Sequence, residues 1–175
     1  MLILLCALAS LREIFPYSLR ENFPHNHHMT TLTPPRVLVA EDNLHCAELL
    51  EAYFSGTNYE VRTVADGEAT LRTVRDWQPD LVLLDVMMPK LSGFEVCKRL
   101  RLDPATRHTS VIMVTALDEP SDVERAVEAG TNDFLTKPIN KAELLLRIKA
   151  MLATRRGQDL PDAIDYMNAV QRGSS

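Results

Sequence analysis

The sequence predicts an α/β domain in which a parallel sheet is covered by helices on both faces. Five short apolar runs, each ending in polar residues, alternate with five segments of helical period. The run at 81–84 is apolar at every position, which is typical of a strand buried on both faces of a parallel sheet. Hydrophobic residues make up 46% of the 175, which is enough for a core and excludes global disorder.

The first half of the domain contains three predicted strands, at 36–40, 60–64 and 81–85. The second alternates polar and apolar residues, which favours a place near an edge of the sheet. The first helix follows from apolar residues at helical spacing: Leu44, Ala47, Leu50 and Phe54. Asp66-Gly67 begins the second helix, and Pro79 ends it.

The second half continues the alternation. Ser92 and Glu95 have the spacing of a capping box and begin a third helix. Strands are predicted at 111–114 and 134–136, with a helix between them that starts at Pro120 and ends at Gly130. Asn140 caps the last helix, which carries one apolar stripe: Leu144, Leu145, Ile148 and Leu152.

Polar residues follow four of the five strands. Right-handed crossovers place the carboxyl ends of parallel strands on one edge, so these residues should meet there: Glu41, Asp42, Asp85, Thr115 and Lys137. Each close carboxylate pair costs about 1 kcal/mol in water and about 4 kcal/mol near a protein surface, so the cluster needs a cation. Oxygen ligands with an open side suit Mg²⁺. With a lysine and a hydroxyl nearby, Asp85 is a candidate nucleophile for phosphoryl transfer.

Five motifs stand at element ends in this order: 39–43 (VAEDN), 84–89 (LDVMMP), 92–93 (SG), 114–116 (VTA) and 135–138 (LTKP). With them, the stretch 36–152 resembles the receiver domain of two-component response regulators. The part from 93 to 108 is most similar to receivers associated with diguanylate cyclases. The resemblance implies a flavodoxin-like, doubly wound (βα)5 parallel sheet with strand order 2-1-3-4-5.

The resemblance also implies a role for each residue at the sheet edge. Asp85 corresponds to the phosphoacceptor, and Thr115, Lys137 and Phe134 to the residues that bind the phosphoryl group or switch with it. The bond between Lys137 and Pro138 is expected to be cis. The implied Mg²⁺ ligands are the carboxylates of Glu41, Asp42 and Asp85 and the backbone carbonyl of Met87. Glu41 stands where an aspartate is commoner, which affects metal affinity rather than function.

The implied function is phosphorelay signalling in the cytoplasm. The chain would accept a phosphoryl group from a sensor histidine kinase or a histidine phosphotransfer protein, as a phosphoprotein and not as an enzyme. The face formed by the fourth helix, fifth strand and fifth helix, roughly 121–152, would switch and can form a homodimer. Met87 and Leu117 are apolar where they could otherwise orient water, so slow autodephosphorylation is expected. The net charge of −5 argues against nucleic acid or an anionic membrane as partner.

The domain boundaries predicted are an unpatterned extension at 1–34, a receiver domain at 35–153 and a tail or broken linker at 154–175. Translation is expected to start at Met29, because the first well-patterned strand follows it. Two outputs remain open: a stand-alone receiver, or the receiver fragment of a longer enzyme such as a diguanylate cyclase. The genomic sequence after codon 175 distinguishes them, since an in-frame stop favours the first.

Overall fold

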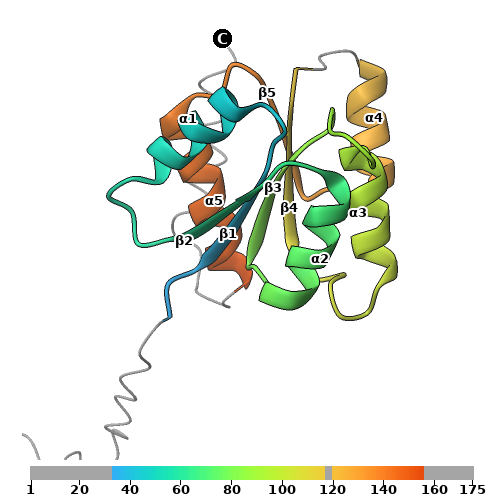
Figure 1. The fold of residues 1–175 in the computed structure, drawn as a ribbon, viewed down its shortest axis with the longest axis horizontal. Helices are drawn as coiled ribbons and strands as arrows, with labels where there is room; N and C mark the ends of the chain where they lie inside the picture. The colour runs from blue at the N-terminus through green and yellow to red at the C-terminus, as the bar shows by residue number, and fades with distance from the viewer. Residues whose placement is uncertain (1–32, 117–119, 156–175) are drawn as a thin grey trace, which may run out of the picture. The chain divides into compact units, whose positions relative to one another are not determined.

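The computed structural model describes residues 33–116 and 120–155. The strands are β1 (Arg36–Ala40), β2 (Glu60–Val64), β3 (Leu81–Asp85), β4 (Ser110–Thr115) and β5 (Asp133–Thr136). The helices are α1 (Leu44–Phe54), α2 (Gly67–Trp77), α3 (Gly93–Leu102), α4 (Pro120–Ala129) and α5 (Lys141–Arg155) (Figure 1). The expected start at Met29, the apolar Leu117 and the tail beyond 155 lie outside the described residues.

All strand pairs are parallel, and the strands lie in the order β2-β1-β3-β4-β5. The predicted fold class and strand order are therefore confirmed. β3 is central and every one of its residues is buried, whereas β2 lies at an edge and none of its residues is fully buried. The sheet thus reproduces the contrast between the apolar run at 81–84 and the alternating run at 60–64.

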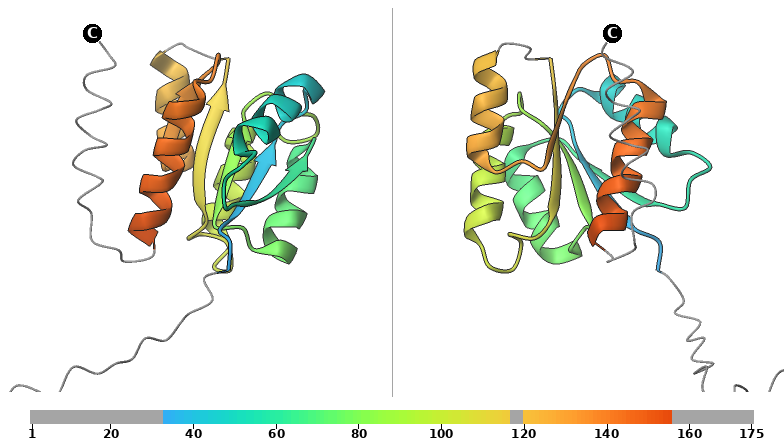
Figure 2. Two further views of the ribbon diagram at one scale, coloured as in Figure 1. Left: turned by 90° about the vertical axis from the view of Figure 1, so that its left-hand side faces the viewer. Right: turned by 180° about the vertical axis from the view of Figure 1, so that it is seen from behind.

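The helices form a layer on each side of the sheet. α1 and α5 cover one face, and α2, α3 and α4 cover the other (Figures 1 and 2). Successive residues of β1 point to opposite layers: Val37 and Val39 pack with α1 and α5, and Leu38 and Ala40 pack with α2 and α3. No helix in the described part of the chain has the length and apolar character needed to cross a membrane.

Four helices begin at a side chain that accepts backbone hydrogen bonds, which fixes where each strand-to-helix loop ends. The capping residues are Asn43, Asp66, Ser92 and Asn140. At α3, Ser92 Oγ accepts from the amide of Glu95 at 3.3 Å, as expected. The Glu95 carboxylate was expected to reach back to the cap, but it instead accepts from Arg99 Nε at 2.9 Å, one turn onward.

The apolar face expected for α1 is only partly correct. Ala47, Leu50 and Phe54 are buried as predicted, whereas Leu44 is 68% exposed. Leu44 is the first residue of the helix and follows the end of β1 by four positions, so its side chain extends beyond the strands. Leu44 therefore lies on the surface close to the carboxyl edge of the sheet.

Arg101 joins α3 to two loops. Its guanidinium donates to the carbonyl oxygens of Gly130 (2.7 Å) and Thr109 (2.9 Å), and to Asn132 Oδ1 (2.7 Å). A further bond reaches the Arg107 carbonyl at 3.1 Å. These bonds fix the α3–β4 and α4–β5 connections against α3, because a guanidinium presents several donors in a rigid fork.

Replacing Arg101 by alanine is expected to lower the free energy of unfolding by about 2 to 4 kcal/mol, since four acceptors lose a charged donor. The neighbouring Arg99→Ala change removes one exposed pair with Glu95 and should cost less than about 0.5 kcal/mol. Urea denaturation of both variants measures the difference. Equal losses would show that the Arg101 contacts do not support the fold.

Candidate functional site

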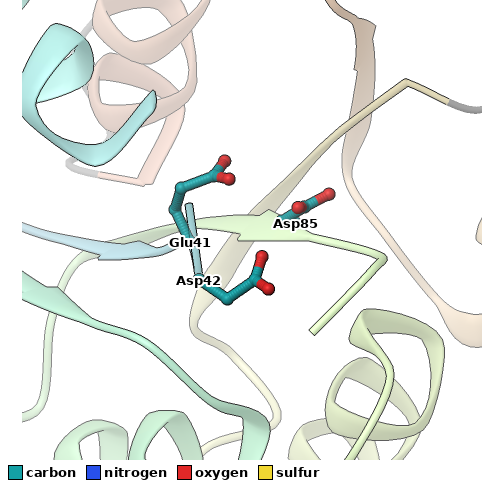
Figure 3. Close-up of side chains that lie close together, drawn as sticks. All are labelled: Glu41, Asp42 and Asp85. Carbon is teal, nitrogen blue, oxygen red and sulfur yellow. The ribbon is translucent and has the colours of Figure 1, made fainter. Parts of the chain in front are cut away.

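Three carboxylates meet at the carboxyl edge of the sheet. Ala40 pairs with Leu84 in the β1–β3 ladder, which brings Glu41 and Asp42, after β1, beside Asp85 at the end of β3. One carboxylate oxygen from each residue lies within 4.8 Å of the other two (Figure 3). Glu41 and Asp85 are only 2% and 5% exposed, whereas Asp42 is open to solvent. This group is therefore strongly acidic, and one of its three members faces solvent; it is called the acidic pocket below.

Lys137 supplies the balancing charge. It follows β5 directly, and its Nζ lies 2.7 Å from Glu41 Oε2 and 3.2 Å from Asp85 Oδ2. Its amide donates to the Thr115 carbonyl at 2.8 Å, and its peptide bond to Pro138 is cis, as expected. The lysine thus bridges two buried carboxylates that come from different strands.

The burial of these groups shifts their ionisation. Burial raises the pKa of the Glu41 carboxyl above its ordinary value; the bond from Lys137 partly offsets this, and the charge of Asp85 adds to it. For Lys137, burial alone would lower the pKa. The hydrogen bond with Glu41 and the charge of Asp85 outweigh it, so the pKa of the ammonium stands above its usual range. The lysine is therefore positively charged in the pocket at neutral pH.

The other three predicted residues differ widely in burial. Thr115 is the last residue of β4 and is fully buried. Phe134 is half-buried and packs against the core cluster on the side of α2, α3 and α4. Met87 is 64% exposed, and its amide donates to Asp85 Oδ1 at 3.3 Å. Thr115 and Met87 therefore touch the acidic pocket through backbone contacts with Lys137 and Asp85.

The donor set fits a hard cation. Three carboxylates that gather around one point, with one of them exposed, provide the oxygen ligands and the open side that Mg²⁺ requires. Within the described residues this group contains no nitrogen or sulfur donor, which disfavours zinc. The residues present therefore suit Mg²⁺ together with a ligand that brings further oxygens.

Comparison with known proteins identifies the architecture. The model of the response regulator receiver domain matches residues 37–149. The chain belongs to the response regulator receiver family. It is 44% identical over 116 residues to the response regulator PleD of Caulobacter vibrioides, covering 66% of this chain and 26% of PleD. The chain thus spans about a quarter of the length of that relative.

Two solved receivers show the same fold. The signal receiver domain of a histidine kinase from Syntrophus aciditrophicus is 34% identical, with a TM-score of 0.65 over 69% of this chain and 91% of that one. The receiver domain of the sensor histidine kinase PA1611 from Pseudomonas aeruginosa is 30% identical, with a TM-score of 0.64 over 68% of this chain and 98% of that one. That second structure holds a magnesium ion coordinated in its active-site cleft. The chain is therefore a signalling domain of the two-component type.

Two contacts of the loop after β3 were not predicted from the sequence. Lys90 Nζ lies 2.7 Å from Asp66 Oδ2, and the Pro89 carbonyl accepts from the Gly67 amide at 3.3 Å. These bonds hold the loop after β3, which contains Met87, against the start of α2. Lys90 has a left-handed φ of 68°, which a residue with a side chain rarely adopts. In the sequence, Asp66-Gly67 indicates the start of the second helix but not a contact with the loop after β3.

Removing the buried Glu41 charge should stabilise the metal-free protein. Because the folded-state pKa of Glu41 is raised, the folded chain binds this proton more tightly than the unfolded chain does. The stability that protonated Glu41 contributes is therefore complete below pH 4.5, the ordinary pKa of a glutamate. It is lost as the pH rises through the raised pKa of the folded state. Glu41→Gln is expected to gain roughly 1 kcal/mol at pH 7, with the gain vanishing below pH 4.5, where wild-type Glu41 is also neutral.

Urea denaturation in EDTA at acidic and neutral pH measures this gain. Glu124→Gln removes an exposed carboxylate from α4 and serves as the matched control. A loss of stability in Glu41→Gln at pH 7 would show that the bond to Lys137 outweighs the burial of the charge.

Proposed function

We propose that the chain accepts a phosphoryl group on Asp85, in a reaction that depends on Mg²⁺, from a phosphohistidine of a sensor kinase or phosphotransfer protein. The observation that carries this proposal is the position of Asp85. Its carboxylate is buried and lies 3.2 Å from the Lys137 ammonium, beside Glu41 and Asp42. A purely structural aspartate would not need two further carboxylates within 4.8 Å, since they destabilise one another.

Glu41, Asp42, Asp85 and the Met87 carbonyl are the residues proposed to hold Mg²⁺. When bound, the ion neutralises the negative charge of the carboxylates and of the phosphoryl oxygens that approach them. The oxygen-only donor set supports this choice, and so does the magnesium ion in the related receiver of PA1611. Asp42 is the member of this group that faces solvent, so we propose that the donor approaches from its side.

The transfer exchanges one bond for another. A carboxylate oxygen of Asp85 bonds to phosphorus while the bond from phosphorus to the imidazole nitrogen breaks, and the electron pair of that bond stays on the nitrogen. Lys137 pairs with a phosphoryl oxygen in place of a carboxylate, because its ammonium already lies between Glu41 and Asp85. The product is an acyl phosphate that carries nearly one more negative charge than the aspartate.

The added charge is proposed to switch the face formed by α4, β5 and α5. The Thr115 hydroxyl moves toward the phosphoryl group, and Phe134 turns inward behind it. Three apolar side chains of these helices are exposed to solvent, which supports contact with a second copy or another protein: Val123 (43%), Val127 (68%) and Leu146 (37%). Sedimentation of the phosphorylated and unphosphorylated chain would detect a dimer formed in this way.

Acetyl phosphate tests the chemistry without a cognate kinase. Incubated with Mg²⁺, the wild-type chain is expected to gain the mass of one phosphoryl group. The same incubation with EDTA should leave the mass unchanged, since three carboxylates outnumber the single ammonium of Lys137 and the excess negative charge repels the donor. A chain that gains no mass with Mg²⁺, or that gains it equally in EDTA, would contradict the proposed function.

The acyl phosphate should be long-lived. Water must be oriented to attack phosphorus and release Asp85 and inorganic phosphate, and the exposed Met87 side chain has no group that can orient it. We expect a half-life well above seconds in buffer that contains Mg²⁺, measured by the decay of the phosphorylated mass. Decay within seconds would show that another group activates water.

A further inference from the structure

The Lys137 loop is anchored by two hydrogen bonds to other elements. The Lys137 amide donates to the carbonyl of Thr115, at the end of β4, at 2.8 Å. Two residues onward, the Ile139 carbonyl accepts from the hydroxyl of Tyr53, on α1, at 3.1 Å. A lysine side chain has four rotatable bonds, so the position of its ammonium depends on a fixed backbone. The tyrosine hydroxyl provides one of these two bonds.

Tyr53 has several contacts to this loop. Its half-buried ring and Ile139 pack against the same core cluster, which includes residues of α1 and α5. Lys141 Nζ, in the first turn of α5, lies 5.9 Å from the centre of the ring. The tyrosine therefore touches the chain on both sides of Asn140, which caps α5.

The helix that carries Tyr53 is also connected to the acidic residues. α1 starts at Asn43, whose side chain caps it and whose amide donates to Glu41 Oε1 at 3.4 Å. Tyr53 thus bonds the loop that carries Lys137 to helix α1, which follows Glu41 and Asp42 in the sequence. The Nζ of Lys137 then lies 2.7 Å from Glu41 and 3.2 Å from Asp85.

We propose that Tyr53 is a positioning residue for Lys137, acting through the Ile139 carbonyl to hold the ammonium where a phosphoryl oxygen will arrive. The proposal rests on the proposed phosphoryl transfer to Asp85. Tyr53 does not touch the phosphoryl group. Its effect should therefore appear in the rate constant at saturating donor and not in metal affinity.

Tyr53→Phe keeps the ring and removes only the hydroxyl donor. The rate constant for phosphorylation at saturating acetyl phosphate is expected to fall by about three- to tenfold, the range for one neutral hydrogen bond. The affinity for Mg²⁺, measured by calorimetry, should change by less than about twofold, because the carboxylates are untouched. Tyr59→Phe is the matched control: this half-buried tyrosine packs edge-on against Phe54 in the same core cluster, and its rate constant should be that of wild type.

A double-mutant cycle separates positioning from general weakening of the fold. In a Lys137→Ala background, Tyr53→Phe should cause no further loss of rate, because the group it positions is absent. A loss of the same size in both backgrounds would overturn the proposal, since the tyrosine would then act independently of the lysine.

Amide hydrogen exchange tests the anchor without any phosphoryl donor. Exchange at the Lys137 amide should be at least about fivefold faster in Tyr53→Phe than in wild type, if the loop opens when one of its two bonds is lost. Unchanged exchange overturns the proposal. Should wild type accept no phosphoryl group, the proposed function fails, while the exchange result still decides whether Tyr53 holds the loop.

Discussion

Asp85→Asn is expected to abolish phosphorylation by acetyl phosphate, with a loss of at least about 100-fold in rate. The amide has nearly the shape of the carboxylate, but its nitrogen is not a nucleophile and its oxygen carries no full charge. The fold should be retained, because Lys137 keeps its 2.7 Å bond to Glu41 and one of three repelling charges is removed. Intact mass after incubation with Mg²⁺ and acetyl phosphate measures the effect.

Two other aspartates provide the controls for this variant. Asp76→Asn changes an exposed residue of α2 and should behave as wild type. Asp42→Asn removes a carboxylate from the same pocket but leaves the nucleophile, so it should still gain one phosphoryl group when Mg²⁺ is raised. If Asp85→Asn is phosphorylated as fast as wild type, Asp85 is not the acceptor.

Gly93→Ala is expected to cause a large loss of stability. A Cβ at this position would collide with the Asp85 carbonyl oxygen and lie 2.9 Å from the Cα of Val86. Both are backbone atoms at the end of a central strand, so neither can rotate away. The Gly93 amide also donates to the Val86 carbonyl at 3.0 Å, which holds α3 close to β3. The free energy of unfolding should fall by about 3 kcal/mol or more.

Gly56→Ala is the matched control, because it adds the same methyl group in open space. Gly56 has a φ of +79° and no atom within 4 Å of an added Cβ, so its cost is about 1 kcal/mol from backbone conformation alone. Urea denaturation of both variants measures the difference. A cost at Gly93 no greater than at Gly56 would mean that α3 can move away from Asp85 at little expense.

Much of the fold can be predicted from the sequence, because a strand that is buried on both faces of a parallel sheet appears as a continuous apolar run. β1, β2 and β3 have the bounds that their patterns predicted. β4 and β5 each begin one residue earlier, at Ser110 and Asp133. Ser110 and Asp133 pair with the neighbouring strand through their backbones. Their polar side chains do not mark them as strand residues in the sequence.

The assembly of the site was predictable for a topological reason. Parallel strands with right-handed crossovers bring their carboxyl ends to one edge, so Glu41, Asp42, Asp85 and Lys137 had to lie near one another. Their unequal burial was not predictable. Glu41 and Asp42 are adjacent acidic residues, and only packing makes the first buried and bonded to Lys137 while the second faces solvent.

Contacts between a long side chain and a backbone carbonyl far away in the sequence were beyond prediction. Arg101 binds three carbonyl oxygens and Tyr53 binds one, and a carbonyl is present at every residue. The residue types in the sequence therefore do not indicate which residue Arg101 or Tyr53 will contact. The same holds for Gly93, whose proximity to the Asp85 carbonyl depends on how α3 packs against β3.

Locating the phosphoryl group tests the central claim most directly. The chain is incubated with acetyl phosphate and Mg²⁺ and treated with borohydride, which reduces an aspartyl phosphate to homoserine, and the peptides are sequenced by mass spectrometry. We predict homoserine at position 85 and at no other aspartate. A phosphoryl group found elsewhere, or an unreduced Asp85 in chain that has gained the phosphoryl mass, would contradict the account.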